Sequence, residues 1–282
     1  MSPSRLWTPT PTDRGAPLSA DELDEAPPKW LDGPRPPEVP WEQLGPEFFD
    51  KWGRPNGKPD PEHVSVYGRS GGGKTYFITY ILTVRANLRG SHAVVIATKK
   101  ADSTLTTAGW PIVDKWPPGY GENDVIFWAH GNLTDEGKAE QRLKIQRLLG
   151  QLWVPEANII VDWDELPFIV EDLGLRHEVT TFYREGRALG ITNVAGMQRP
   201  AGVTRYPHSE AGWTVSFKPK DQDDRKRIAE VFGNRRYYLD VLKSLDAERH
   251  QFVMKRELTG EVCISSLPAT RPHLIKRENS PR

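Results

Sequence analysis

From position 63 onward, short apolar runs alternate with longer segments in which apolar residues recur every three or four positions. The apolar runs lie at 63–68, 92–98, 124–130, 157–163 and 191–198. Helices are predicted between them at 75–88, 134–152 and 177–189. In the second helix Ile145, Leu148 and Leu152 fall on one face. Short apolar strands separated by helices are typical of a parallel sheet that helices cover on both faces.

The region after Gly212 continues this α/β pattern and then changes. A strand is predicted at 214–219, a helix at 221–232 and a helical turn near 238–245. The last two apolar runs are 251–258 and 260–267, and Thr259-Gly260 between them predicts a β hairpin. We therefore expect a mostly parallel central sheet flanked by helices, with a small C-terminal β hairpin.

The first 62 residues differ from the rest because they hold 14 of the 25 prolines. Proline removes a backbone donor and restricts the residue before it, so we predict a largely disordered, proline-rich arm. Trp7, Trp30, Trp41 and Trp52 interrupt this arm. Docking of these rings on the chain's own domain is the favoured interpretation, and docking on a partner is the alternative. The predicted organisation is an arm at 1–62, a folded α/β domain at 63–270 and a frayed tail at 271–282.

Composition narrows the class of protein. No stretch approaches the ~18 apolar residues that a membrane helix needs, and the N-terminus has no apolar secretory segment. The single cysteine, Cys263, excludes an intramolecular disulfide and a cysteine-rich zinc site. These points predict a cytoplasmic protein. The 38 basic and 38 acidic residues balance, so no overall positive field points to nucleic acid.

A glycine-rich segment fits the phosphate-binding pattern G-x-x-x-x-G-K-[ST] without a mismatch, and it lies between a predicted strand and a predicted helix. Its glycines let several backbone N–H groups point at one phosphate, and the helix presents its positive end. Lys74 is expected to reach the β- and γ-phosphates of ATP as a catalytic group, and Thr75 to ligate Mg²⁺. The predicted nucleotide contacts are Gly68, Arg69, Ser70, Gly71, Gly72, Gly73, Lys74, Thr75 and Tyr76.

Acidic residues lie at the end of the apolar run at 157–163. Buried carboxylates are costly unless they serve a metal, so Asp162, Asp164 and Glu165 are candidates for a magnesium–nucleotide site. We predict Asp164 as the Mg²⁺ ligand and Glu165 as the catalytic carboxylate. A shift to Asp162 and Asp164 as the metal pair stays open, as does a simple helix N-cap.

Gln198 follows the run at 191–198 at its C-terminal tip. The carboxyl ends of parallel strands meet at one edge of the sheet, where ligands bind. Gln198 is therefore a candidate to sense the γ-phosphate or to orient the attacking water, and a turn amide that caps backbone is the alternative.

Three segments together resemble the FtsK/HerA superfamily of DNA-pumping ATPases. GRSGGGKT looks like its Walker A loop, IVDWDEL like its Walker B strand, and GRALGITNVAGMQRP like its helix-to-strand passage. The resemblance implies a RecA-like core of the ASCE P-loop class, hydrolysis of ATP with Mg²⁺ between subunits of a hexameric ring, and an arginine acting in trans. The candidate arginines are Arg184, Arg187, Arg199 and Arg205, of which Arg187 matches the family pattern best.

The resemblance also implies translocation of DNA, in viral genome packaging or mobile-element transfer, with the protein in the host cytoplasm or the virion. The alternatives are a protein-translocating ATPase and a nucleotide-binding scaffold. The loop after the second strand departs from the family at 97–100 and is a candidate DNA grip. Its relevant side chains are Lys99, Lys100, Trp110, Lys115 and Trp116. A basic tail is a second candidate, comprising Lys218, Lys220, Arg225, Lys226, Arg227, Arg235 and Arg236.

Overall fold

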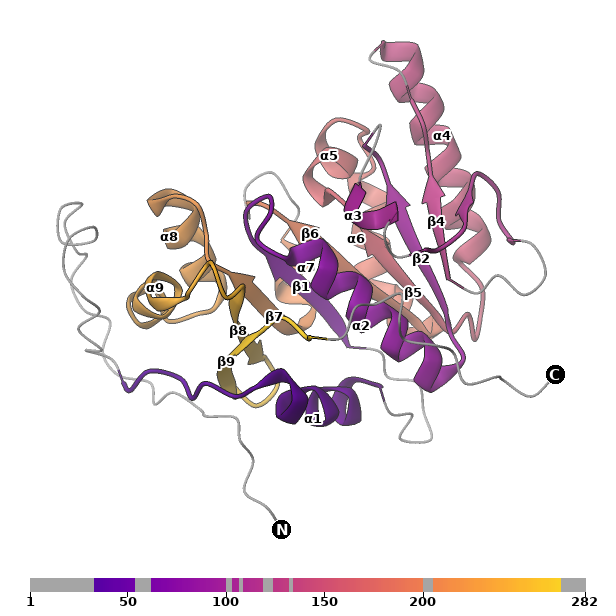
Figure 1. Ribbon diagram of the computed structural model, residues 1–282. Helices are drawn as coiled ribbons and strands as arrows, with labels where there is room; N and C mark the ends of the chain where they lie inside the picture. The colour runs from indigo at the N-terminus through magenta and orange to yellow at the C-terminus, as the bar shows by residue number, and fades with distance from the viewer. Residues whose placement is uncertain are drawn as a thin grey trace.

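A computed structural model describes residues 33–53, 62–99, 103–106, 109–118, 124–131, 134–199 and 205–269. In these residues the strands form one nine-stranded sheet in the order β3-β4-β2-β5-β6-β1-β7-β8-β9. All neighbours from β3 to β7 pair in parallel, and β8 and β9 continue the sheet in antiparallel fashion. Helices lie on both faces of this sheet (Figure 1). The predicted α/β architecture is therefore confirmed.

The strands follow the apolar runs of the sequence closely. The parallel strands are β1 His63–Tyr67, β2 His92–Ala97, β3 Ile112–Val113, β4 Asp124–Trp128, β5 Ile159–Trp163, β6 Ile191–Met197 and β7 Ala211–Phe217. The predicted C-terminal hairpin consists of β8 Gln251–Arg256 and β9 Val262–Ser266. β5 lies between β2 and β6, and β6 separates it from β1.

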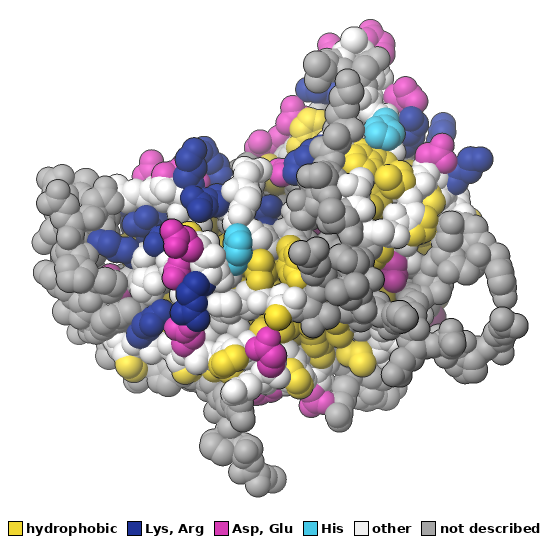
Figure 2. Space-filling view, in the orientation of Figure 1, with side chains coloured by type: hydrophobic (Ala, Val, Ile, Leu, Met, Phe, Trp, Pro, Cys, Tyr) yellow, Lys and Arg dark blue, Asp and Glu magenta, His cyan; other side chains and the backbone are white. Residues whose placement is uncertain are grey.

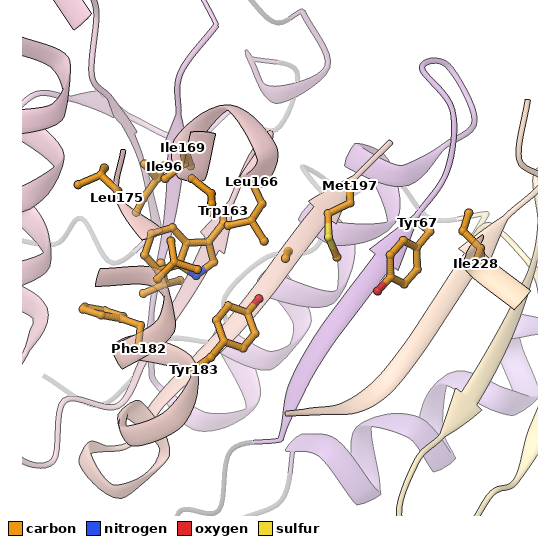
Figure 3. Close-up of a cluster of buried hydrophobic side chains, with 14 of the residues drawn as sticks. Tyr67, Ile96, Trp163, Leu166, Ile169, Leu175, Phe182, Tyr183, Met197 and Ile228 are labelled. Carbon is orange, nitrogen blue, oxygen red and sulfur yellow. The ribbon is translucent and has the colours of Figure 1, made fainter. Parts of the chain in front are cut away.

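Two hydrophobic cores lie on opposite faces of the sheet. On one face, helices α2 (Lys74–Arg89) and α3 (Ser103–Thr106) cover the central strands. The other face carries α4 Asp135–Leu152, α5 Leu166–Glu171, α6 Arg176–Glu185, α8 Gln222–Val231 and α9 Arg235–Ser244. Figure 3 shows part of this second core, where Trp163 of β5 packs with Phe182 and Tyr183 of α6. Side chains of β5 and β6 thus alternate between the two cores.

Part of the predicted N-terminal arm belongs to the folded domain. Residues 41–53 form helix α1 (Trp41–Gly53), whose Trp41, Phe48 and Trp52 are buried in the core that α2 covers. Before it, the Val39 backbone N–H donates to the Ile264 carbonyl at 2.8 Å, which extends the edge of the sheet at β9. The prediction of a largely disordered arm is wrong for 33–53, because the aromatic rings outweigh the proline content once a core surface is available. Docking on the chain's own domain holds for Trp41 and Trp52. Trp7, Trp30 and the predicted tail at 271–282 lie outside the described residues.

The predicted helix 177–189 is interrupted. It divides into α6 and the 3₁₀ helix η2 (Gly186–Leu189), and buried polar contacts fix the junction. Asn193 Nδ2 donates to the Phe182 carbonyl at 2.9 Å, and Trp163 Nε1 donates to Asn193 Oδ1 at 3.1 Å. His63 accepts from the Asn193 backbone N–H at Nδ1 and donates from Nε2 to the Tyr183 carbonyl, both at 3.0 Å. These bonds tie the end of α6 to β1, β5 and β6.

Candidate nucleotide site

The glycine-rich segment forms the connection between β1 and α2, as the pattern requires. Gly73 is the N-cap of α2 with φ 100°, a left-handed conformation that favours glycine. Lys74 opens the helix and is buried, with 7% of its surface exposed. A Cβ at Gly196 of β6 would lie 3.8 Å from Lys74 Cδ, so the lysine stem runs beside that strand. Lys74 therefore projects from the loop toward the carboxyl end of the central sheet.

Residues from the C-terminal hairpin region brace this loop, which the sequence did not indicate. His250 Nδ1 lies 3.3 Å from the carbonyl oxygen of Gly72, and Tyr76 Oη donates to the Pro268 carbonyl at 3.2 Å. A Cβ at Gly73 would lie 2.8 Å from Leu267 Cδ1, closer than carbon atoms approach. The only sequence signal available for these contacts was the glycine itself, which permits a close neighbour but does not identify it.

The acidic residues of β5 meet the loop at the same edge. Asp162 lies inside β5 on the face that α2 covers, and Asp164 follows the strand; both are buried. Glu165, two residues beyond β5, has φ 59° and is the N-cap residue of α5, but its side chain makes no cap hydrogen bond. The helix N-cap alternative therefore holds for the Glu165 backbone and not for its carboxylate. That carboxylate is directed to other partners.

The charges at this edge are strongly coupled. Burial raises the pKa of Asp162 well above its usual range, the Asp164 charge raises it further, and Lys74 and Lys99 oppose the rise. Asp162 Oδ1 has no hydrogen-bond partner among the described residues. Burial also works to raise the pKa of Glu165, but the hydrogen bonds and charges of its neighbours, led by Lys99, hold it below its ordinary value. The surroundings at this edge thus shift the pKa values of the two acids in opposite directions, upward for Asp162 and downward for Glu165.

Two side chains from neighbouring strands meet Glu165. Gln198, directly after β6, donates from Nε2 to Glu165 Oε1 at 3.0 Å. Lys99, just beyond β2, places Nζ 2.9 Å from the same oxygen and 4.0 Å from Asp164 Oδ2. The structure therefore brings Gln198 to the predicted site. It also brings Lys99 there, although the sequence pattern placed Lys99 in a loop that contacts DNA.

The predicted trans-acting arginine lies at the other edge of the sheet. Arg187 is in η2, which precedes β6, whereas Gln198 follows β6. At ~3.3 Å a residue, a strand of this length separates them by about 20 Å. Arg187 therefore does not approach Lys74 or Glu165 of its own chain.

The other candidate arginines contact aspartates, a tyrosine ring or solvent. Arg199 lies 3.4 Å from Asp224 of α8 and 3.6 Å from Asp221, the N-cap residue of that helix. The Arg184 guanidinium lies 5.6 Å from the centre of the Tyr206 ring. Arg205 is the exposed N-cap residue of α7 (Tyr206–Ser209).

Only some side chains of the candidate DNA-contacting segments are exposed to solvent. Trp116 packs edge-on against His92 with ring centres 5.7 Å apart, and Trp110 packs on the core beneath α2, so both rings have packing roles. Lys115 is exposed, whereas Lys100 lies outside the described residues. Figure 2 shows Lys and Arg side chains gathered over the part of the face where α8 and α9 lie, with acidic side chains among them. The exposed members of the basic tail there are Lys220, Arg227 and Arg235.

The donor set agrees with magnesium held together with a nucleotide. Of the residues that the structure describes, no group of three or more His, Cys, Asp or Glu side chains is arranged to hold a metal ion by itself. Mg²⁺ usually keeps several waters and is bound by one or two carboxylates plus phosphate oxygens. Asp162 Oδ1, which is buried without a hydrogen bond among the described residues and feels the charge of Asp164, is compatible with that mode.

Comparison with solved structures places this geometry in a known fold. No protein-family model and no curated protein matches the chain. The genome-packaging NTPase B204 of Sulfolobus turreted icosahedral virus 2, solved with AMPPCP, aligns with TM-score 0.56 and 12% identity, covering 76% of this chain and 100% of that one. The DNA-packaging ATPase B204 of Sulfolobus turreted icosahedral virus aligns with TM-score 0.55 and 14% identity, covering 75% and 99%. The chain therefore has the fold of these packaging NTPases.

A secretion protein shares the same fold. The cytoplasmic domain of the type VII secretion ATPase EccC of Thermomonospora curvata aligns with TM-score 0.50 and 13% identity. The alignment covers 77% of this chain but only 27% of the EccC domain. Of the helices in the described part of the chain, none combines the length and apolar character needed to cross a bilayer.

Proposed function

We propose that this protein is an ATP-hydrolysing motor that translocates double-stranded DNA. The observation that carries the ATPase proposal is the convergence at one sheet edge of Lys74 from the phosphate loop with Asp164, Glu165 and Gln198 from two strands. These residues come from three separate segments of the chain. Their meeting at the carboxyl edge of a parallel sheet is the arrangement that nucleotide hydrolysis needs.

Each residue has a role that follows from its chemistry. The loop N–H groups and Lys74 would bind the β- and γ-phosphates, and Thr75 with Asp164 would hold Mg²⁺. Magnesium supplies neutralisation of charge on the phosphates when it is bound. Glu165, ionised and already hydrogen-bonded by Gln198, would align the attacking water. Asp162 stays the alternative carboxylate for the metal, because a bound cation would oppose the rise in its pKa that burial causes.

A ring of subunits completes this site. Arg187 lies at the opposite edge of the sheet from the nucleotide residues of its own chain, so it can act only on a neighbouring subunit. Positive charge from an arginine stabilises the transferred phosphoryl group in such shared sites. We propose a homo-oligomer, hexameric by resemblance, in which each Arg187 serves the next subunit. The motor would work in the host cytoplasm or in association with a virion.

DNA is favoured as the substrate over protein for two reasons. The B204 proteins with the same fold are a genome-packaging NTPase and a DNA-packaging ATPase, and the side of α8 and α9 presents basic side chains to solvent. A motor that grips phosphates needs such local basic groups rather than overall positive charge. The likeness to EccC supports a second candidate, translocation of protein through a secretion channel.

The test is the ATPase rate as a function of protein concentration, with and without duplex DNA. A shared active site predicts a specific rate that rises with concentration as rings assemble, and a DNA motor predicts stimulation by duplex DNA. Glu165→Gln should abolish turnover while ATP still binds. Hydrolysis without any response to DNA would support protein translocation. Absence of hydrolysis in the wild-type protein would refute the motor.

A further inference from the structure

The candidate catalytic carboxylate is clamped from two sides. β5 lies between β2 and β6, so Glu165 at its end is flanked by the residues that follow both neighbours. Gln198 and Lys99 both bind Oε1, at 3.0 and 2.9 Å. One partner is a neutral amide and the other a cation, and charge-assisted hydrogen bonds are roughly twice as strong as neutral ones. Lys99 is therefore the stronger restraint on the orientation of Glu165.

The backbone that carries Lys99 is itself held in place. Trp128 Nε1, from the end of β4, donates to the Lys99 carbonyl at 2.6 Å. Gln141 Nε2, from α4, donates to the carbonyl of Thr98 at 3.1 Å. Both donors fix the turn that leaves β2, so the lysine starts from a defined position. A side chain built on a restrained turn loses less conformational freedom when it forms an ion pair.

We propose that Lys99 is a positioning residue for the ATPase reaction, which holds the Glu165 carboxylate where it aligns the attacking water. This inference rests on the proposed function. Glu165 has no cap hydrogen bond of its own, so without Lys99 the hydrogen bond that remains on the carboxylate among the described residues is the one from Gln198. Reaction rates are sensitive to displacements of about 1 Å in such groups, with losses of up to ~100-fold. Because Lys99 is 38% exposed, it can be replaced without opening the core.

The site also explains why a lysine is suited to this position. Nζ lies 2.9 Å from Glu165 and 4.0 Å from Asp164, so one ammonium faces two acids. An ordinary exposed ion pair contributes little, but Asp164 is 7% and Glu165 18% exposed, and charges at such depth are less screened by water and salt. Lys99 thereby places one positive charge beside both carboxylates.

The test replaces Lys99 and separates binding from turnover. Lys99→Met should lower kcat by about 5- to 20-fold, while KM for ATP and the binding of an ATP analogue with Mg²⁺ change less than about twofold. Lys99→Arg keeps the charge and should restore kcat to within about threefold of wild type. Lys99→Gln, with a donor but no charge, should fall between them. Melting temperatures show whether each variant is folded.

Lys144→Met is the matched control. Lys144 is 33% exposed and makes a 2.8 Å ion pair with Glu140 on α4, away from the nucleotide site. It should leave kcat and KM at wild-type values. An unchanged or increased kcat in both Lys99→Met and Lys99→Gln would overturn the positioning role, and so would a loss confined to KM. These outcomes leave the ATPase proposal standing, whereas wild-type protein without ATP hydrolysis refutes that proposal and the positioning role with it.

Discussion

Replacing Trp52 by alanine tests whether α1 is an integral part of the ATPase domain. Trp52 is 1% exposed and stacks on Phe48 with ring centres 5.1 Å apart. Its Nε1 donates to the Glu62 carbonyl at 2.9 Å, and the buried Arg85 guanidinium lies 4.3 Å from the ring centre. One side chain therefore joins α1, the start of β1 and α2.

The expected loss follows from these contacts. Truncation of a buried tryptophan to alanine costs about 3–5 kcal/mol, a desolvated cation–π contact contributes about 2, and a net hydrogen bond about 1. These contributions overlap, so we expect Trp52→Ala to lower the free energy of unfolding by about 4–6 kcal/mol. Trp52→Phe keeps the stacking but not the hydrogen bond and should lose about 1–2 kcal/mol. A domain of ordinary stability would be close to unfolding in the alanine variant.

Urea denaturation followed by circular dichroism measures this loss. The control is Leu258→Ala, because Leu258 is 76% exposed and its truncation should change stability by less than about 0.5 kcal/mol. If Trp52→Ala destabilised the protein by less than about 1 kcal/mol, α1 would not be packed in the core. Residues 33–53 would then form the detached arm that the proline content predicted.

Three further results are expected from the nucleotide site. Gly73→Ala should weaken ATP binding at least tenfold in an equilibrium titration, because the backbone φ is 100° and the new Cβ would lie 2.8 Å from Leu267 Cδ1. The control Gly150→Ala, whose new Cβ would have no atom within 4 Å, should bind ATP like the wild type. Asp162→Asn should stabilise the nucleotide-free protein increasingly as pH rises above ~4. The pKa of Asp162 is raised in the folded state, so the folded wild type retains a proton that the unfolded chain releases. Wild-type stability therefore falls by up to about 1.4 kcal/mol per pH unit between the unfolded and folded pKa values, and the asparagine variant lacks this loss. Chemical denaturation at several pH values measures this slope, and a constant difference would contradict it. His250→Ala should weaken ATP binding by a few-fold without changing kcat, because the ring supports a loop carbonyl and does not reach Glu165; a loss of kcat alone would show another role.

The sequence by itself determined the strand-and-helix alternation, the phosphate loop and the acidic strand end. These features are local: apolar periodicity sets the element type, and glycines, Lys74 and consecutive acids are recognisable from neighbouring residues. The meeting of β1, β5 and β6 at one edge also followed, because parallel strands align their carboxyl ends. The division of α6 from η2 at Gly186 did not follow, because the buried contacts that fix it involve residues from other strands.

Only the tertiary structure decided the contacts between distant segments. Proline content predicted an arm at 33–53, but burial of Trp41 and Trp52 depends on a surface formed by α2 and the sheet. From the sequence, a lysine after a strand is interpreted as a basic loop residue. The strand order β2-β5-β6 is what places Lys99 beside Glu165. The brace from His250 likewise arises from antiparallel strands added after the parallel core. Such contacts depend on which strands become neighbours, which the pattern within any single segment does not specify.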